Sequence, residues 1–305
     1  MLHELPLVIF TICAQMSVGS FIALGLINIL GWKVPAETMK RVTRPALYAI
    51  GPLLVLGLAA STLHLGSPLR AVNAIRHLDG SWLSREILFG MAFLVLGAAF
   101  AISEWFGWFN VRLRQALAAV AALVGIGLVW CISMVYSLRT IPAWSTYHTP
   151  VRFYITTFLL GGLAVGAALV IAAHIRTRRT HLDDPAGDKL LVDSVRGIAL
   201  GGVLALGLKF IGQPAYMAYL GTHPDPAATE SLDILVNTYG GFSAAQNILI
   251  FAGILLLGIL LFLLSGKHRA KTILPIVAVT AFVLVLAGEV IGRMLFYASM
   301  VRTGL

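Results

Sequence analysis

The stretch Ala244–Ser265, AAQNILIFAGILLLGILLFLLS, decides the fold class of this chain. It contains no Asp, Glu, Lys or Arg, and it ends at a Ser265-Gly266 break before a basic triplet. A helix that crosses the hydrocarbon core of a bilayer needs about 20 predominantly apolar residues. This stretch therefore predicts a transmembrane α-helix.

The composition of the whole chain agrees with that prediction. Of its 305 residues 59% are hydrophobic and only 11% are charged, and the mean hydropathy is +0.90. A water-soluble protein needs a charged shell, whereas a lipid bilayer tolerates an apolar one. The net charge of +9 does not indicate nucleic-acid binding, because the basic residues lie in short loops between apolar runs. We therefore expect an integral membrane protein with the bilayer as its surroundings.

Seven further apolar runs have the same character, and Gly, Pro and Thr residues punctuate the breaks between them. The sequence predicts an all-α, polytopic membrane protein with eight transmembrane helices in one membrane domain over residues 1–305. The expected spans are 6–31, 45–64, 86–106, 115–138, 153–174, 195–220, 244–265 and 273–299.

Loop charges predict the orientation. Loops that carry Lys and Arg usually face the cytoplasm. The loops after spans 1, 3, 5 and 7 hold most of these residues, so both termini are expected on the outer, periplasmic side of a bacterial inner (cytoplasmic) membrane. The expected outer side carries fewer basic residues, namely Arg70, Arg76, Arg85, Arg139, Arg152 and Arg302.

Two ionisable residues face each other across one outer loop. His64 ends the second expected span, and Glu86 opens the third. Each has an ordinary structural explanation: a histidine suits a helix C-terminus, and a carboxylate suits the first turn of a helix that Ser84 could cap. The short loop, however, should place the two helices side by side and antiparallel. An imidazole and a carboxylate at the lip of a membrane bundle also suit proton transfer, and such residues are costly at membrane depth.

Three charges are expected deeper in the bundle. Glu289 and Arg293 share one face of the last span at i,i+4 spacing, which favours an intrahelical pair. Lys209 in the sixth span has no near neighbour in sequence and needs a partner across the bundle, for which Glu289 is a candidate. The amides of Gln15, Asn28, Gln246 and Asn247 favour interhelical hydrogen bonds over ligand binding.

The chain is not expected to hold a redox centre. Cys13 and Cys131 lack the spacing of a cluster or zinc site, so neither an iron–sulfur cluster nor structural zinc is expected. No two histidines fall on facing positions at mid-membrane depth, which disfavours a b-type haem.

Several segments together resemble the membrane-anchor subunit of dimethyl sulfoxide reductase, within the wider family of quinol-interacting anchors of molybdoenzymes. They are His3-Glu4 with PLVIFT, LHLGSPLRAVN, LSREI, TIPAW with Thr149-Pro150, and AGEVIGRMLFY, and they run in order along the chain. The resemblance implies two partners, an iron–sulfur electron-transfer subunit and a molybdopterin catalytic subunit. It also implies menaquinol as the substrate, with His64, Arg70 and Glu86 at the quinol-binding site.

On this interpretation menaquinol is oxidised at the outer ends of the second and third spans, and its electrons leave to a cluster in a partner. The anchor of a related selenate, tetrathionate or polysulfide reductase is an alternative. A multi-span transporter that uses Lys209, Glu289 and Arg293 as coupling charges is a less favoured one. The outer arginines are either scatter in the charge rule or a docking surface for an acidic partner.

Overall fold

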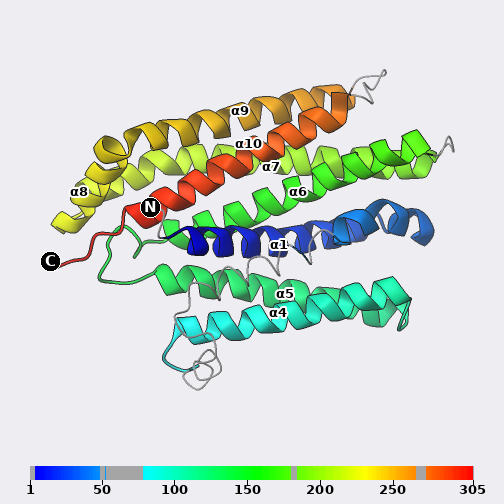
Figure 1. The fold of residues 1–305 in the computed structure, drawn as a ribbon, viewed down its shortest axis with the longest axis horizontal. Coiled ribbons are helices and arrows are strands. Elements are labelled where there is room, and N and C mark those ends of the chain that lie inside the picture. The colour runs from blue at the N-terminus through cyan, green and yellow to red at the C-terminus, as the bar shows by residue number, and fades with distance from the viewer. Residues whose placement is uncertain (1–3, 49–51, 53–77, 180–183, 266–272, 305) are drawn as a thin grey trace.

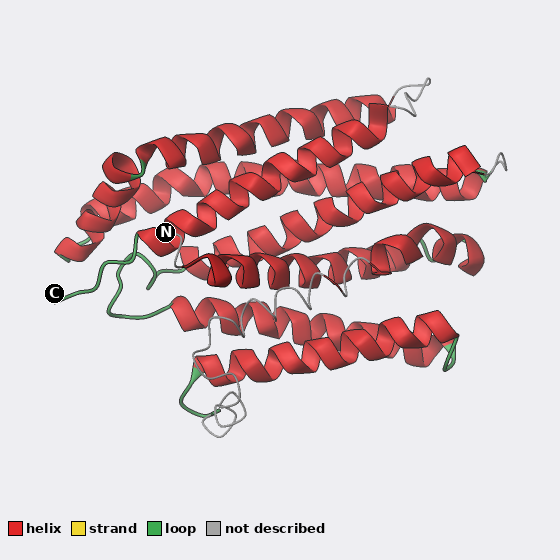
Figure 2. Cartoon of the chain, viewed as in Figure 1, coloured by secondary structure: helices red, strands yellow, loops and turns green. Residues whose placement is uncertain are grey.

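The computed structural model describes residues 4–48, 52, 78–179, 184–265 and 273–304, and over these residues the chain is helical with no strand (Figures 1 and 2). Within the described residues, seven helices are long and apolar enough to cross a membrane. They are α1 (Leu5–Leu30), α4 (Trp82–Phe106), α5 (Val111–Tyr136), α6 (His148–Arg179), α7 (Pro185–Thr222), α9 (Gly240–Ser265) and α10 (Ile273–Ala298). The expected second span, 45–64, lies almost wholly outside the described residues, so the expected total of eight is not tested.

The helices form a bundle that is wider than it is deep (Figure 1). The pair α4 and α5 lies along one edge, and α1 packs between α5 and α6. On the other side of α6, α9 packs against both α7 and α10. Large side chains such as Phe262, Ile211 and Leu204 remain exposed on the outside of the bundle, as expected for surfaces that face lipid.

The contact between α1 and α6 depends on glycine. A Cβ added at Gly161 would lie 2.1 Å from the carbonyl carbon of Gly19, and one added at Gly19 would lie 1.8 Å from the carbonyl oxygen of Thr157. The hydroxyl of Ser20 donates to the Gly161 carbonyl at 3.2 Å. Small residues allow two membrane helices to approach this closely, and dispersion contacts then hold them together.

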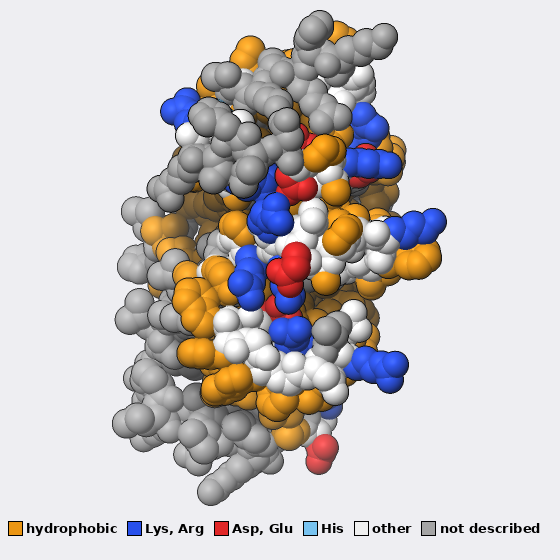
Figure 3. All heavy atoms as spheres, turned by 90° about the vertical axis from the view of Figure 1, so that its right-hand side faces the viewer, with side chains coloured by type: hydrophobic (Ala, Val, Ile, Leu, Met, Phe, Trp, Pro, Cys, Tyr) orange, Lys and Arg blue, Asp and Glu red, His pale blue; other side chains and the backbone are white. Residues whose placement is uncertain are grey.

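From α4 onward, successive described spans run in alternating directions, whereas α1 and α4 run in the same direction because the expected second span between them lies outside the described residues (Figure 1). The two ends of the described chain lie at the same end of the bundle. This arrangement agrees with the alternation of basic and less basic loops. Figure 3 looks onto the opposite end, where Lys and Arg side chains gather among Asp and Glu. The side of the membrane that each end faces remains a prediction. The term outer end denotes the end of the bundle at which α1 and α4 begin.

Of the helix starts, those of α7 and α6 differ most from the expected spans. Helix α7 begins at Pro185, because Pro185 occupies its first turn and the Asp184 carboxylate caps the amide of Gly187 at 3.0 Å. Helix α6 begins at His148 and includes Pro150 in its first turn, where proline removes no intrahelical hydrogen bond.

The connection between α7 and α9 also contains structure that was not predicted. It holds the short helix α8 (Pro226–Asp233) and a π-helical turn, Ile234–Thr238.

Candidate functional site

Glu86 lies near the outer end of α4 with its side chain buried in the bundle. The residue is 8% exposed, and no described residue forms a hydrogen bond or ion pair with its carboxylate. Ser84 does not cap this helix as expected. Ser81 does so instead, accepting from the amide of Ser84 at 3.3 Å, so α4 starts one turn earlier. Glu86 therefore lies deeper than a capping carboxylate, and capping does not explain it.

Arg85 holds the chain that leads into α4. Its guanidinium donates to the carbonyls of Leu78 at 2.7 Å and Asp79 at 2.8 Å and lies over the Trp82 ring. These contacts fix the start of the helix that carries Glu86. The other two expected site residues, His64 and Arg70, lie outside the described residues, so their approach to Glu86 stays a prediction.

An aromatic cluster fills the outer part of the bundle between α5, α6 and α10. The Tyr297 hydroxyl donates to that of Tyr136 at 2.8 Å, and the Trp144 ring stacks on Phe296. The Trp144 indole N–H also donates to the Phe296 carbonyl at 2.8 Å. The TIPAW segment thus ties the loop after α5 to the end of α10.

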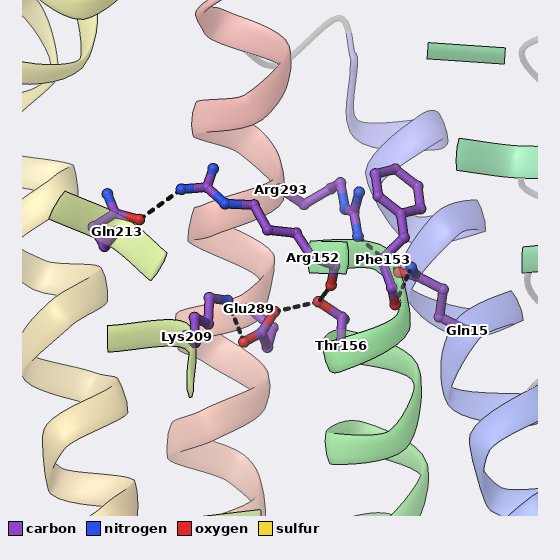
Figure 4. A network of polar contacts seen from close by, with 8 residues as sticks. All are labelled: Gln15, Arg152, Phe153, Thr156, Lys209, Gln213, Glu289 and Arg293. Atoms are coloured by element: carbon purple, nitrogen blue, oxygen red, sulfur yellow. Dashed lines mark hydrogen bonds and ion pairs between the residues drawn. The ribbon is translucent and has the colours of Figure 1, made fainter. Parts of the chain in front are cut away.

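A network of charged and polar side chains connects α1, α6, α7 and α10 (Figure 4). Lys209 of α7 pairs with Glu289 of α10, which confirms the suggested contact across the bundle. The other carboxylate oxygen of Glu289 accepts from the Thr156 hydroxyl of α6 at 2.8 Å. Because Glu289 is only 3% exposed, these two donors satisfy a carboxylate that would otherwise be very costly.

The expected intrahelical pair between Glu289 and Arg293 is wrong. The two side chains leave α10 in different directions, and Arg293 donates to the Gln15 amide oxygen of α1 at 2.8 Å (Figure 4). Its guanidinium also lies 3.7 Å from the centre of the Phe153 ring. Lys209 supplies the positive charge near Glu289, so Arg293 is left to connect α10 to α1.

Of the two amides expected to bond across helices from α1, one does so and the other does not. Gln15 makes the expected interhelical bond, since its amide nitrogen donates to the Phe153 carbonyl at 2.9 Å. Asn28 instead donates to the Leu24 carbonyl of its own helix at 2.8 Å.

Arg152 does not lie in an outer loop, where the sequence predicts it. It lies in α6 and reaches across to α7, where it donates to the Gln213 amide oxygen at 2.7 Å and lies over the Tyr216 ring (Figure 4). Arg139, by contrast, is exposed as expected. The proximity of Pro150 made residue 152 look like loop. The signal that was available is its spacing of four residues from Thr156, which places both on one helix face.

Comparison with known proteins assigns the chain to a family. The family model described as DMSO reductase anchor subunit (DmsC) matches residues 1–186. One chain of the anaerobic dimethyl sulfoxide reductase of Escherichia coli is 31% identical over 304 residues, which cover 99% of this chain and 97% of that protein. A second anaerobic dimethyl sulfoxide reductase chain of the same bacterium, YnfH, is 30% identical over 308 residues, with the same coverage.

One subunit of the sulfite dehydrogenase of Allochromatium vinosum is 33% identical over 141 residues, which is 41% of this chain and 42% of that protein. This last similarity is partial, whereas the matches to the reductase chains run along the full length. This chain, an integral membrane protein with several apolar helices, belongs to the family of dimethyl sulfoxide reductase anchor subunits.

Proposed function

We propose that this chain anchors a dimethyl sulfoxide reductase-type complex in the bacterial inner membrane and oxidises menaquinol at its outer end, with His64, Arg70 and Glu86 as the quinol-binding residues. An iron–sulfur subunit takes the electrons and passes them to a molybdopterin catalytic subunit. The family membership supports the anchor role, and the quinol chemistry is the part that the experiments below address.

The observation that carries this proposal is the burial of Glu86. A buried carboxylate without a partner among the described residues is costly, and no structural task in α4 accounts for it, because Ser81 provides the cap. A quinol hydroxyl is a hydrogen-bond donor that such a carboxylate can accept from. The position near the outer end of α4 also gives a proton a short way to the membrane surface.

The oxidation removes two electrons and two protons from the quinol. On this proposal His64 accepts one hydroxyl proton or orients the ring, Glu86 accepts or relays a proton, and Arg70 orients Glu86 or the loop. Both protons leave on the outer face. Because no redox centre is expected in this chain, the electrons pass to the iron–sulfur subunit.

Replacing Glu86 by Gln tests the proposal. The variant keeps the size and loses the proton-accepting group. A positioned general base contributes about 100-fold to 10,000-fold to a rate, so we expect a quinol-dependent reductase rate at least about 100-fold lower. The rate with a soluble artificial electron donor should be unchanged, since that donor bypasses the anchor.

Glu230→Gln is the matched control. Glu230 lies in α8 at the same end of the bundle, and it is exposed. This variant should keep both rates. If Glu86→Gln also retains its quinol-dependent rate, Glu86 has no role in the chemistry and the proposed site is wrong.

The terminal electron acceptor of the complex is a separate question. The partial match to a sulfite dehydrogenase subunit indicates that similar chains belong to other enzymes. The identity of the catalytic subunit that co-purifies with the chain decides between dimethyl sulfoxide and the selenate, tetrathionate or polysulfide alternatives.

A further inference from the structure

A second polar site lies between α6, α7, α9 and α10, away from Glu86. It is a cavity of about 50 Å³, and the side chains of the charged network line it together with Gln246 of α9 and Ser243 near the start of that helix. A cavity needs roughly 10–15 Å³ of this kind of volume to hold one water molecule, so this one has room for about three or four water-sized atoms. A quinol ring is too large for it.

Positive charge dominates the lining. Arg152, Lys209 and Arg293 are cationic, and Glu289 is the one carboxylate among the described residues that line the cavity. Lys209 and Glu289 balance each other, which leaves two guanidinium groups without a carboxylate partner among those residues. Excess positive charge inside a membrane bundle is costly unless an anion compensates it.

The unused hydrogen-bonding groups are mainly donors. Arg152 has five N–H groups, of which one bonds Gln213. Gln246 is only 8% exposed, and its amide forms no hydrogen bond with any described residue. The Glu289 carboxylate is already engaged, because one oxygen accepts from Lys209 and the other from Thr156.

The amide of Gln246 lies against the backbone of α10. A Cβ added at Gly292 would lie 2.3 Å from its side-chain nitrogen, so glycine at this position leaves room for the amide where it lies. A buried amide that lies against a neighbouring helix without a hydrogen-bond partner is costly in a membrane protein unless it binds a ligand.

We propose that this cavity binds a small monovalent anion of the carboxylate type, with Arg152 and Gln246 as its hydrogen-bond donors. The planar fork of a guanidinium matches a carboxylate, and the charge of Arg293 adds to the attraction. A ligand of three heavy atoms, such as formate, fits the volume. Such an anion would connect α6, α9 and α10 and stabilise their packing.

Formate is the probe for the test. The full-length chain, extracted in detergent together with the subunits that co-purify, is unfolded thermally at increasing formate concentration and constant ionic strength. Gluconate, a carboxylate too large for the cavity, replaces formate in the reference series. Since a ligand that binds only the folded state raises the unfolding midpoint, we expect a saturable rise with formate and none with gluconate.

Two variants locate the effect. Loss of a charge-assisted hydrogen bond should weaken formate at least about tenfold in Arg152→Gln, whereas Arg139→Gln, which changes an exposed arginine at the same end, should match the unaltered protein. Gln246→Met keeps the volume and all the charges, so it tests the site if Arg152→Gln does not fold.

The proposal is overturned if the unaltered chain shows no saturable response to formate, or if gluconate raises the midpoint equally. It is also overturned if every folded variant of Arg152 and Gln246 responds like the unaltered protein. The readout is an unfolding midpoint and not turnover, so the outcome does not depend on whether Glu86 binds quinol.

Discussion

Replacing Lys209 by Met should destabilise the bundle strongly. The substitution leaves Glu289, which is 3% exposed, with the Thr156 hydroxyl as its one remaining described donor. Removing one partner of a buried ion pair typically costs about 3–5 kcal/mol, because the other charge stays buried without compensation. That is a large part of the total stability of an ordinary domain.

The cost arises from the pair and not from Lys209 alone, so a second substitution should relieve it. In Lys209→Met with Glu289→Met, no charge of the pair remains, and buried ion pairs replaced by apolar residues are often neutral in stability. We expect the double variant to lose at least about 2 kcal/mol less than the sum of the single losses.

The assay is a double-mutant cycle. The free energy of unfolding of the full-length chain is measured by titration with a denaturing detergent, followed by tryptophan fluorescence. If Lys209→Met costs less than about 1 kcal/mol, or if the single losses simply add, then Lys209 and Glu289 are not coupled and the account of the network is refuted.

Three further predictions concern packing and capping. Gly161→Leu should prevent α1 and α6 from packing, so that no folded protein is recovered in detergent extracts. The control Gly97→Ala, with no described atom within 4 Å of the added Cβ, should be recovered normally, and equal recovery of the two variants would contradict the close approach of α1 and α6. Trp144→Phe keeps an aromatic ring but removes the donor to the Phe296 carbonyl, so the free energy of unfolding should fall by about 1–3 kcal/mol; an unchanged value would mean that this bond is not needed. Asp184→Ala should lower the free energy of unfolding by about 1 kcal/mol, because the α7 cap is lost. Asp184→Asn should lower it less, because asparagine caps equally well and loses only the exposed ion pair with Arg41. A larger loss in Asp184→Asn than in Asp184→Ala would show that the ion pair contributes more than the cap.

The membrane architecture could be predicted because it follows from uninterrupted apolar length. Runs such as Ala244–Ser265 admit one solution in lipid, and α9 ends at the predicted residue. The polar ends of helices were harder to predict. Residues 185–194 read as loop because they are hydrophilic, yet the Asp184 cap and Pro185 start α7 there, beyond the apolar part of the span.

The side-chain network could be predicted only in part. A lysine in an apolar helix requires a partner, so the pairing of Lys209 with Glu289 was accessible from sequence. Spacing of i,i+4 permits a contact but does not require one. Arg293 contacts Gln15 and Phe153 instead, because Glu289 is already paired with Lys209. Which helix lies opposite a given face depends on the packing of the whole bundle, and the spacing within one helix does not contain that information.

The location of the quinol site is the central claim, and photolabelling tests it most directly. The intact complex is irradiated with a photoreactive menaquinone analogue, and the labelled peptides are identified by mass spectrometry, with excess menaquinone as competitor. We predict competable label in the peptides that carry His64, Arg70 and Glu86. Competable label confined to peptides of α7, α9 and α10, or to other subunits, would contradict the proposed site.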